Sequence, residues 1–355
     1  MSSNRSRRLR HITLAGSLCL IVVALPVHVS WGQRQAGPGI DVSGHLDVRA
    51  VEGNTAVENN DFQIGQFVLN LSSEINERVT ANMQIAYATK ARDVVLDEAY
   101  ADWGFFTWDG HSSTDPLGIT KTGMIIGQFD VPFGLDWRNY NSVDRRLVSV
   151  PLVINEIHRG WNDLGVQFYA EATWANWSVF AVNGFGTSPA LRLDQTEPVA
   201  PRLIAADEAA ADDIIPTEAY GARFGLYMNE QFEFGTSFAA GYGADHDQQN
   251  RMFGFDVTGT FDELELKGEF ISRRRDFSTG RWDDLGYYVQ GTYAWGRQFG
   301  VLRGDAYRPD GGPADFCGSA GAGYLVHANA QLRVEYRLAQ GSSNDTIYLQ
   351  TAIAF

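Results

Sequence analysis

The sequence predicts an all-β protein, a transmembrane antiparallel up-and-down β-barrel of about 16 strands with a long inward-folded loop. Three observations lead to this prediction. The chain begins with a secretory signal, apolar and polar residues alternate along the rest of it, and the final strand runs to the last residue. Strands of a membrane barrel show this alternation because one face meets lipid and the other meets water.

Residues 1–32 have the features of a secretory signal peptide. Four arginines in the first ten residues precede an apolar stretch at 12–25, and Ser30 and Gly32 place small residues before a cleavage site. The apolar stretch is shorter than the ~20 residues that a transmembrane helix needs. We therefore expect export, cleavage after Gly32, and a barrel formed by residues 33–355.

The charge and the cysteine content exclude several classes of protein. The formal net charge is -15, and it becomes -19 without the four signal arginines, because residues 1–32 contain no acid. An excess of acidic residues argues against a nucleic-acid partner. Cys317 is the single cysteine after the signal, so a disulfide within the mature chain is excluded and the sheet itself must supply stability.

Alternation at a period of two residues predicts sixteen strands. They lie at 39–50, 62–73, 78–89, 92–103, 119–129, 163–171, 175–185, 218–228, 231–242, 250–260, 263–274, 284–295, 298–308, 319–328, 331–339 and 345–355. Tight turns alternate with longer links such as 130–162 and the acidic 186–217, which is typical of periplasmic turns and extracellular loops. Because 92–103 and 175–185 alternate poorly and the link 104–118 is long, fourteen or eighteen strands remain open.

Charged residues share one face of the clearest strands. In 331–339, Leu332 and Val334 lie on one face, and charged residues lie on the other. An arginine or lysine at the bilayer midplane costs ~2–4 kcal/mol, so the charged faces must line water. The residues predicted to line the lumen are Arg49, Arg223, Lys267, Glu269, Arg333, Glu335 and Arg337.

The final strand, 345–355, alternates to its last residue, Phe355. Chain ends usually fray in soluble domains, whereas an unpaired strand edge is not tolerated in lipid. A terminal phenylalanine also resembles the signal that bacterial outer-membrane proteins present to the barrel-assembly machinery. The alternative is an ordinary edge strand of a β-sandwich.

The stretch Gly127-Gln-Phe-Asp-Val-Pro-Phe-Gly-Leu-Asp136 resembles the junction between strand and loop in the phosphate-selective porin family (porins O and P). The segment Leu96-Asp-Glu-Ala-Tyr100 resembles another strand of that family. Pro132 lacks a backbone donor and Gly134 permits unusual dihedral angles, so the chain can leave the wall there. We expect Gly127, Pro132, Phe133 and Gly134 to start an inward-folded constriction loop over 130–162.

The resemblance implies an outer-membrane porin that assembles as a homotrimer among lipid and lipopolysaccharide. Phosphate selectivity in the family is associated with rows of lysines, but the chain after the signal has only three lysines. Arginines are better represented, and we expect four in the loop to line the pore constriction. They are Arg138, Arg145, Arg146 and Arg159. The net charge favours cations whereas these arginines favour anions, so the sequence leaves selectivity open.

The expected function is a water-filled channel for passive diffusion of small hydrophilic solutes or ions across the outer membrane, anions such as phosphate included. A phosphate-binding glycine loop, zinc-ligand spacing and a nucleophile elbow are all missing from the sequence. We therefore expect no catalytic, cofactor-binding or metal-binding residues. The alternatives are a secreted soluble all-β binding protein and a barrel enzyme of the outer membrane.

Overall fold

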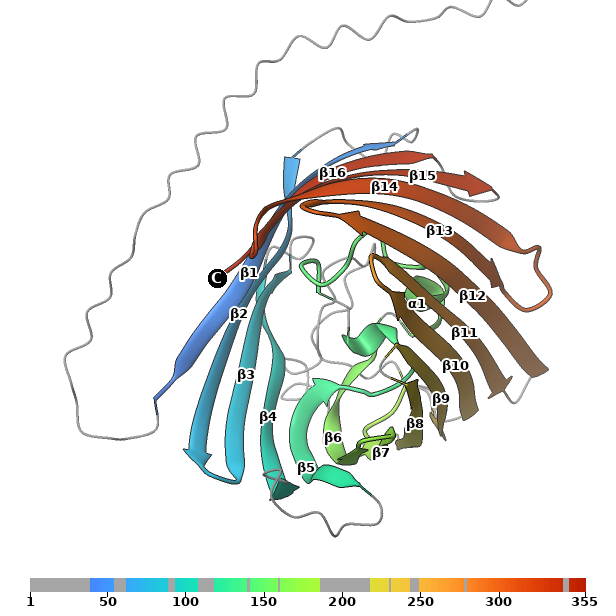
Figure 1. The fold of residues 1–355 in the computed structure, drawn as a ribbon. Helices are drawn as coiled ribbons and strands as arrows, with labels where there is room; N and C mark the ends of the chain where they lie inside the picture. The colour runs from blue at the N-terminus through green and yellow to red at the C-terminus, as the bar shows by residue number, and fades with distance from the viewer. Residues whose placement is uncertain are drawn as a thin grey trace, which may run out of the picture. The chain divides into compact units, whose positions relative to one another are not determined.

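The computed structural model describes residues 39–53, 62–88, 93–107, 118–138, 141–158, 160–185, 218–229, 231–242, 249–277, 280–340 and 345–355. The predicted signal peptide 1–32, the acidic loop 186–217 and Arg159 lie outside these residues. Sixteen strands form one closed antiparallel barrel in which each strand pairs with its neighbours in the sequence, and β1 pairs with β16 (Figure 1). The predicted fold class and the number of strands are confirmed.

The first eight strands are β1 (Asp41–Gly53), β2 (Phe62–Asn76), β3 (Val79–Ala88), β4 (Asp93–Thr107), β5 (Ile119–Asp130), β6 (Asn162–Ala172), β7 (Ala175–Val182) and β8 (Ala219–Asn229). The second eight are β9 (Phe232–Tyr242), β10 (Gln249–Phe261), β11 (Leu264–Phe277), β12 (Gly280–Trp295), β13 (Gln298–Arg308), β14 (Asp315–His327), β15 (Ala330–Gln340) and β16 (Thr346–Ala354). Each strand that alternation predicted is present, with its ends displaced by a few residues.

The barrel is apolar outside and polar inside. On β15, Val334 and Leu338 are 47% and 55% exposed, whereas Arg333 and Glu335 are buried. A globular sandwich would show the reverse arrangement, with apolar side chains in its core. The charged strand faces therefore point into the barrel, as the sequence predicts.

Two strands, β7 and β4, have local structure that accounts for the weak alternation of apolar and polar residues in their sequences. On β7, Phe180 and Val182 point inward and are buried in an apolar cluster, so both faces of this strand are apolar. β4 extends to Thr107, and it therefore includes four residues that the sequence assigned to the link 104–118. The poor alternation of β7 comes from apolar packing inside the barrel, whereas β4 shifts its register against β3 at Asp97, one extra residue between the pairs Gln84–Glu98 and Ile85–Leu96.

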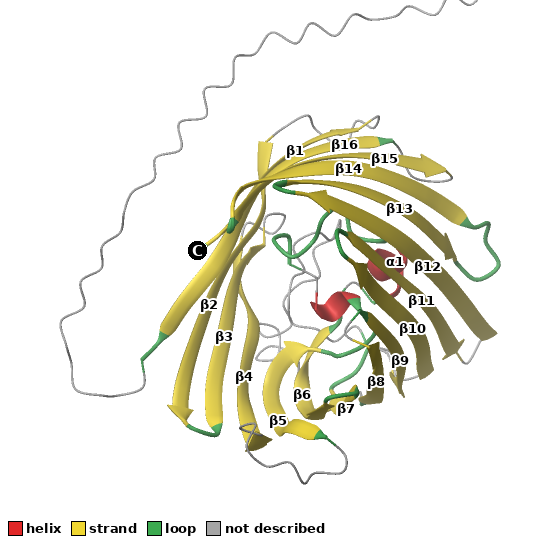
Figure 2. Ribbon diagram, in the orientation of Figure 1, coloured by secondary structure: helices red, strands yellow, loops and turns green. Residues whose placement is uncertain are grey.

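The segment between β5 and β6 lies inside the ring of strands. It contains two short helices, η1 (Asp136–Arg138) and α1 (Leu152–Ile157), which Figure 2 shows in red within the barrel. α1 contacts β11, β12 and β13. In the part of the chain that is described, no helix has the length and apolar character to cross a membrane.

The first and last strands join along a continuous ladder from His45 opposite Ala354 to Gly53 opposite Thr346. Beyond it, Gly44 and Phe355 exchange two backbone hydrogen bonds of 2.9 Å. The backbone of Phe355 is thus hydrogen-bonded within the sheet, and its side chain is exposed on the outer face. Its role as an assembly signal stays a prediction.

Met83 and Gln84 on β3 provide a matched test of the two faces. Met83 points outward and is exposed, whereas Gln84 points inward and donates a 2.6 Å hydrogen bond to Asp97. We expect Met83→Arg to destabilise the barrel by ~2–4 kcal/mol, because the charge meets lipid. Gln84→Arg should fold normally, since the new cation faces water and acidic residues. Heat-modifiable migration and denaturant unfolding in bilayers measure both, and equal stability of the two variants would contradict the orientation.

Candidate functional site

Of the four residues predicted to start the inward loop, Gly127 lies within β5 and the other three follow this strand, and both glycines are required for steric reasons. Gly127 has a φ of +135°, and a Cβ there would lie 2.2 Å from the Ala99 carbonyl oxygen. Gly134 has a φ of +70°, and its Cβ would lie 1.7 Å from Oε1 of Glu269. Pro132 and Phe133 between them are buried. The predicted junction therefore brings the loop backbone into close contact with the barrel wall.

An apolar cluster attaches the loop to the wall. Phe133 and Ile154 from the loop are fully buried, and Phe133 packs edge-on to His158 with ring centroids 5.9 Å apart. The loop residues of the cluster are Val131, Phe133, Leu152, Val153, Ile154, Ile157 and Trp161. The wall supplies Phe129, Phe180, Val182, Ala219, Ala239, Met252, Ile271, Tyr288, Tyr307 and Cys317. The barrel thus contains a small hydrophobic core of its own.

Polar side chains of β8, β9 and β11 bind the backbone at the beginning of the loop. Nε of Arg223 donates to the Gly134 carbonyl at 2.8 Å, and the Gly134 amide donates to Oγ of Ser237 at 2.9 Å. The Leu135 amide donates to Oε1 of Glu269 at 3.2 Å. These side chains satisfy backbone groups that have no partner within the loop.

Charged side chains of β13 and β15 bind the later part of the loop. Glu335 accepts hydrogen bonds from the amides of Val148 and Ser149 at 2.7 and 2.8 Å. Arg303 donates to the Ser149 carbonyl at 2.8 Å and pairs with Asp305 at the same distance. Hydrogen bonds to charged groups are each worth about 1.5–3 kcal/mol. The wall charges therefore act mainly as anchors for the loop.

The seven residues predicted to line the lumen all lie on inward-facing positions, but most are covered by the loop. Arg223, Lys267, Glu269, Arg333 and Glu335 are buried, with exposed fractions between 1% and 8%. Arg49 and Arg337 are half-buried. Arg333 donates to the carbonyls of Ser142 and Arg145, which shows that it too binds the loop. The sequence identifies the face of these residues but not what covers them.

The arginines of the loop contact different parts of the wall. Arg138 is exposed, pairs with Glu233 at 3.1 Å and donates to Asn176 at 3.4 Å. Arg145 is buried, and the guanidinium of Arg146 lies 5.1 Å from the ring centroid of Phe299 on β13. The described arginines therefore do not form one cluster, and of them only Arg138 lines the cavity described next.

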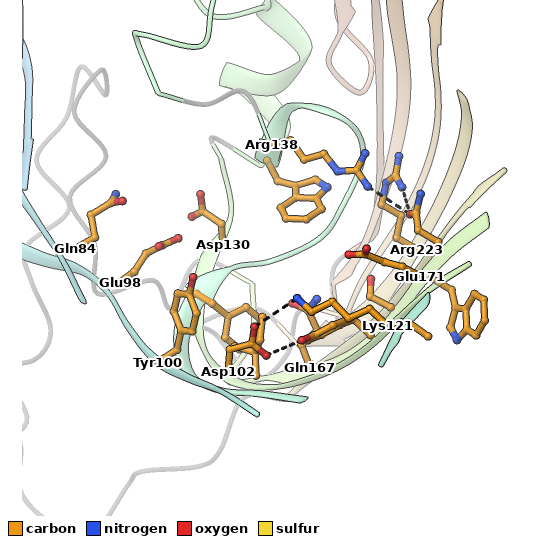
Figure 3. Close-up of a pocket in the computed structure, with 18 of the residues that line it drawn as sticks. Gln84, Glu98, Tyr100, Asp102, Lys121, Asp130, Arg138, Gln167, Glu171 and Arg223 are labelled. Atoms are coloured by element: carbon orange, nitrogen blue, oxygen red, sulfur yellow. Dashed lines mark hydrogen bonds and ion pairs between the residues drawn. The ribbon is translucent and has the colours of Figure 1, made fainter. Parts of the chain in front are cut away.

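An open cavity of about 330 Å³ lies between the loop and the wall formed by β3 to β8. Figure 3 shows Glu98, Tyr100 and Asp102 from β4 on one side and Arg138 and Arg223 on the opposite side. The loop contributes Trp137, Arg138 and Asn141 to the lining of the cavity. The cavity is the candidate functional site.

The cavity places acidic and basic groups next to aromatic rings. Asp102 accepts a 2.7 Å hydrogen bond from the Tyr169 hydroxyl and lies 3.8 Å from Nζ of Lys121. Nζ of Lys121 also lies 4.9 Å from the centre of the Tyr169 ring. Sequence reasoning did not propose Glu98 or Asp102. The family resemblance of Leu96-Asp-Glu-Ala-Tyr100 included Glu98 but not Asp102.

Arg223 connects the cavity to the wall behind it. Its guanidinium pairs with Asp256 at 2.8 Å and with Glu233 at 3.3 Å, and Glu233 also pairs with Arg138. Both arginines at the cavity therefore have carboxylate partners. Among the described residues, no group of three or more histidine, cysteine or acidic side chains is arranged to hold a metal ion.

Solved structures share this fold at low sequence identity. The outer-membrane channel DcaP of Acinetobacter baumannii is 12% identical, with a TM-score of 0.61 over 91% of this chain and 99% of that chain. An anion-selective porin from Comamonas acidovorans is 10% identical, with a TM-score of 0.59 over 90% and 100%. The trimer form of OmpT, an outer-membrane protein of Vibrio cholerae, is 10% identical, with a TM-score of 0.61 over 90% and 100%. No family model and no curated protein matches the sequence. The chain therefore has the porin fold, and this likeness shows the fold alone.

Removing the Glu335 carboxylate tests how the loop is anchored. We expect Glu335→Ala to leave the barrel folded but to speed hydrogen exchange at the amides of Val148 and Ser149 about a hundredfold, because two charge-assisted bonds are lost. Glu74→Ala, at the exposed end of β2, is the control. Exchange at these amides that stays at the wild-type rate would show that the apolar cluster alone holds the loop.

Proposed function

We propose that the chain forms a water-filled channel for passive diffusion of small hydrophilic solutes across a bacterial outer membrane. The observation that carries this proposal is the closed barrel whose apolar face is outside and whose charged face surrounds a loop and a cavity. Only helices and closed barrels satisfy all their backbone groups within lipid. The loop narrows the lumen, so solutes pass beside β3 to β8.

Four further features support the location and the assembly. The signal peptide predicted at 1–32 directs export, and Phe355 provides the terminal residue for the barrel-assembly machinery. The outer face carries an apolar belt, in which Leu302 is 69% exposed, that suits lipid and disfavours the alternative of a secreted soluble binding protein. One of the similar solved structures, OmpT, is a trimer form, and we propose a homotrimer here.

The charges around the cavity favour small cations over phosphate. Its lining includes the carboxylates Glu98, Asp102, Asp130 and Glu171 and the cations Lys121, Arg138 and Arg223. Glu233 and Asp256 add two carboxylates behind the arginines, which gives six acids and three bases. A narrow passage with low-dielectric walls focuses the field of such groups. We therefore propose a weakly cation-preferring passage, and we do not transfer the phosphate specificity of the resembling family.

Planar-bilayer recording of the purified full chain tests the proposed channel. We expect discrete conductance steps, and in a salt gradient a reversal potential that indicates weak cation preference. This preference should persist in high salt, because charges at a narrow passage are screened less than charges on external loops. A folded barrel that produces no conductance in bilayers would contradict the proposal. Hydrolysis of bilayer lipid by the same preparation would favour the barrel enzyme.

Substitutions on the two sides of the cavity should move the reversal potential in opposite directions. Asp102→Asn removes a carboxylate and should shift it toward anions, whereas Arg138→Ala removes a cation and should shift it toward cations. Arg146→Ala, whose side chain stacks on Phe299 outside the cavity lining, is the control and should leave it unchanged. A shift of the reversal potential for Arg146→Ala as large as that for Arg138→Ala would instead support the arginine-lined constriction that the sequence predicts.

A further inference from the structure

The cations on the outer face of the barrel lie in one patch. Along the described strands, arginine and lysine side chains occupy inward-facing positions except for four exposed arginines on consecutive strands. These are Arg251 on β10, Arg274 on β11, Arg281 on β12 and Arg308 on β13. We call this set the outer arginine patch. Each lies an even number of positions from exposed apolar residues of its own strand, such as Phe253 on β10 and Leu302 on β13, and therefore faces outward with them.

The strand register places Arg251 and Arg274 directly beyond a row of outward-facing aromatic side chains. Phe255 lies opposite Phe270, which lies opposite Tyr287, and these residues form a row across β10, β11 and β12. Four residues further along β10 and β11, Arg251 lies opposite Arg274. Arg251 and Arg274 are thus at the edge of the apolar outer surface, at the barrel end where β5 continues into the loop. Arg281 near the start of β12 and Arg308 at the end of β13 lie at the same end of the barrel.

Like charges placed opposite each other on adjacent strands destabilise a sheet. Arg251 and Arg274 form such a pair, and the acids nearby neutralise only part of the patch. Arg274 pairs with Asp283 at 2.8 Å, and Arg281 pairs with Asp276 at 3.1 Å. Asp310, in the adjoining turn, accepts a hydrogen bond from the Asp283 amide. No ion pair joins Arg251 or Arg308 to a carboxylate among the described residues, so the patch has an excess of positive charge.

The position of the patch identifies the chemistry that would neutralise it. In a membrane barrel, residues just beyond the apolar belt lie at the level of the lipid headgroups. Arginine is suited to this level because its stem covers apolar surface while its planar guanidinium binds phosphate through two parallel hydrogen bonds. Anionic headgroups attract such cations by about 1 kcal/mol for each side chain.

We propose that the outer arginine patch binds the phosphorylated headgroup of an anionic lipid in the outer leaflet. This inference rests on the proposed function, because it requires the barrel to span that membrane. It assigns a lipid-facing role to β10–β13. Arg251 and Arg308, which have no ion pair among the described residues, are the principal phosphate contacts, and the neighbouring aromatic row covers the first carbons of the acyl chains.

The test compares two double variants that remove the same charge. Arg251→Gln with Arg308→Gln changes the patch, whereas Arg78→Gln with Arg297→Gln changes exposed turns at the opposite end of the barrel. Purified full chains are titrated with diphosphoryl lipid A, and bound lipid is counted by native mass spectrometry. We expect the patch variant to bind about tenfold more weakly than wild type and the turn variant to bind as wild type does.

Two further titrations identify the group that is bound. Dephosphorylated lipid A should bind the wild-type chain about tenfold more weakly, and inorganic phosphate at millimolar concentration should leave lipid binding unchanged. Equal weakening in both double variants, equal binding of dephosphorylated lipid, or displacement by free phosphate would each overturn the inference. Conductance recorded on the same preparations separates the two proposals. Conducting channels without lipid preference refute this inference alone, and lipid preference without conductance refutes the proposed function alone.

Discussion

The hydrogen bonds between charged wall residues and the backbone of the loop determine the interior of this barrel. An irregular segment buried inside a protein needs a partner for each amide and carbonyl. Glu335, Glu269 and Arg223 supply several of these partners, and each reaches the loop from a different strand. The charged inner faces of the strands therefore have a structural purpose as well as an electrostatic one.

This anchoring places the loop against most of the wall. The apolar cluster joins the loop to β5 and to β7 through β14, and Glu335 on β15 binds it as well, whereas a cavity stays open beside β3 to β8. The groups that line the cavity come mainly from the wall, with Arg138 as the charged contribution of the loop. A mixed lining of this kind depends on the position of the loop, and releasing the loop from Glu335 would alter the cavity although Glu335 itself does not line it.

The sequence predicts the strands well because alternation is a local property that depends on neighbouring residues. It is least informative at 175–185, where Phe180 and Val182 face inward and pack against Trp161 and its neighbours from the loop. The roles of Arg145 and Arg146 depend on partners more than a hundred residues away, which local patterns do not identify. Glu98 and Asp102 were not predicted as site residues for the same reason. The local sequence shows that a carboxylate faces inward, but it does not show which part of the lumen stays open.

The pairing of Gly44 with Phe355 brings the first and last strands of the barrel side by side. These residues are 311 positions apart (355 − 44), yet their backbones are directly bonded. Every other strand contact joins consecutive strands, so the ring has the same neighbour relation at each of its steps. A short linker joining the two ends, with a new break in an external loop, would preserve all sixteen ladders. The architecture is therefore circular in its connectivity, because β1 and β16 are paired in the same way as any two consecutive strands.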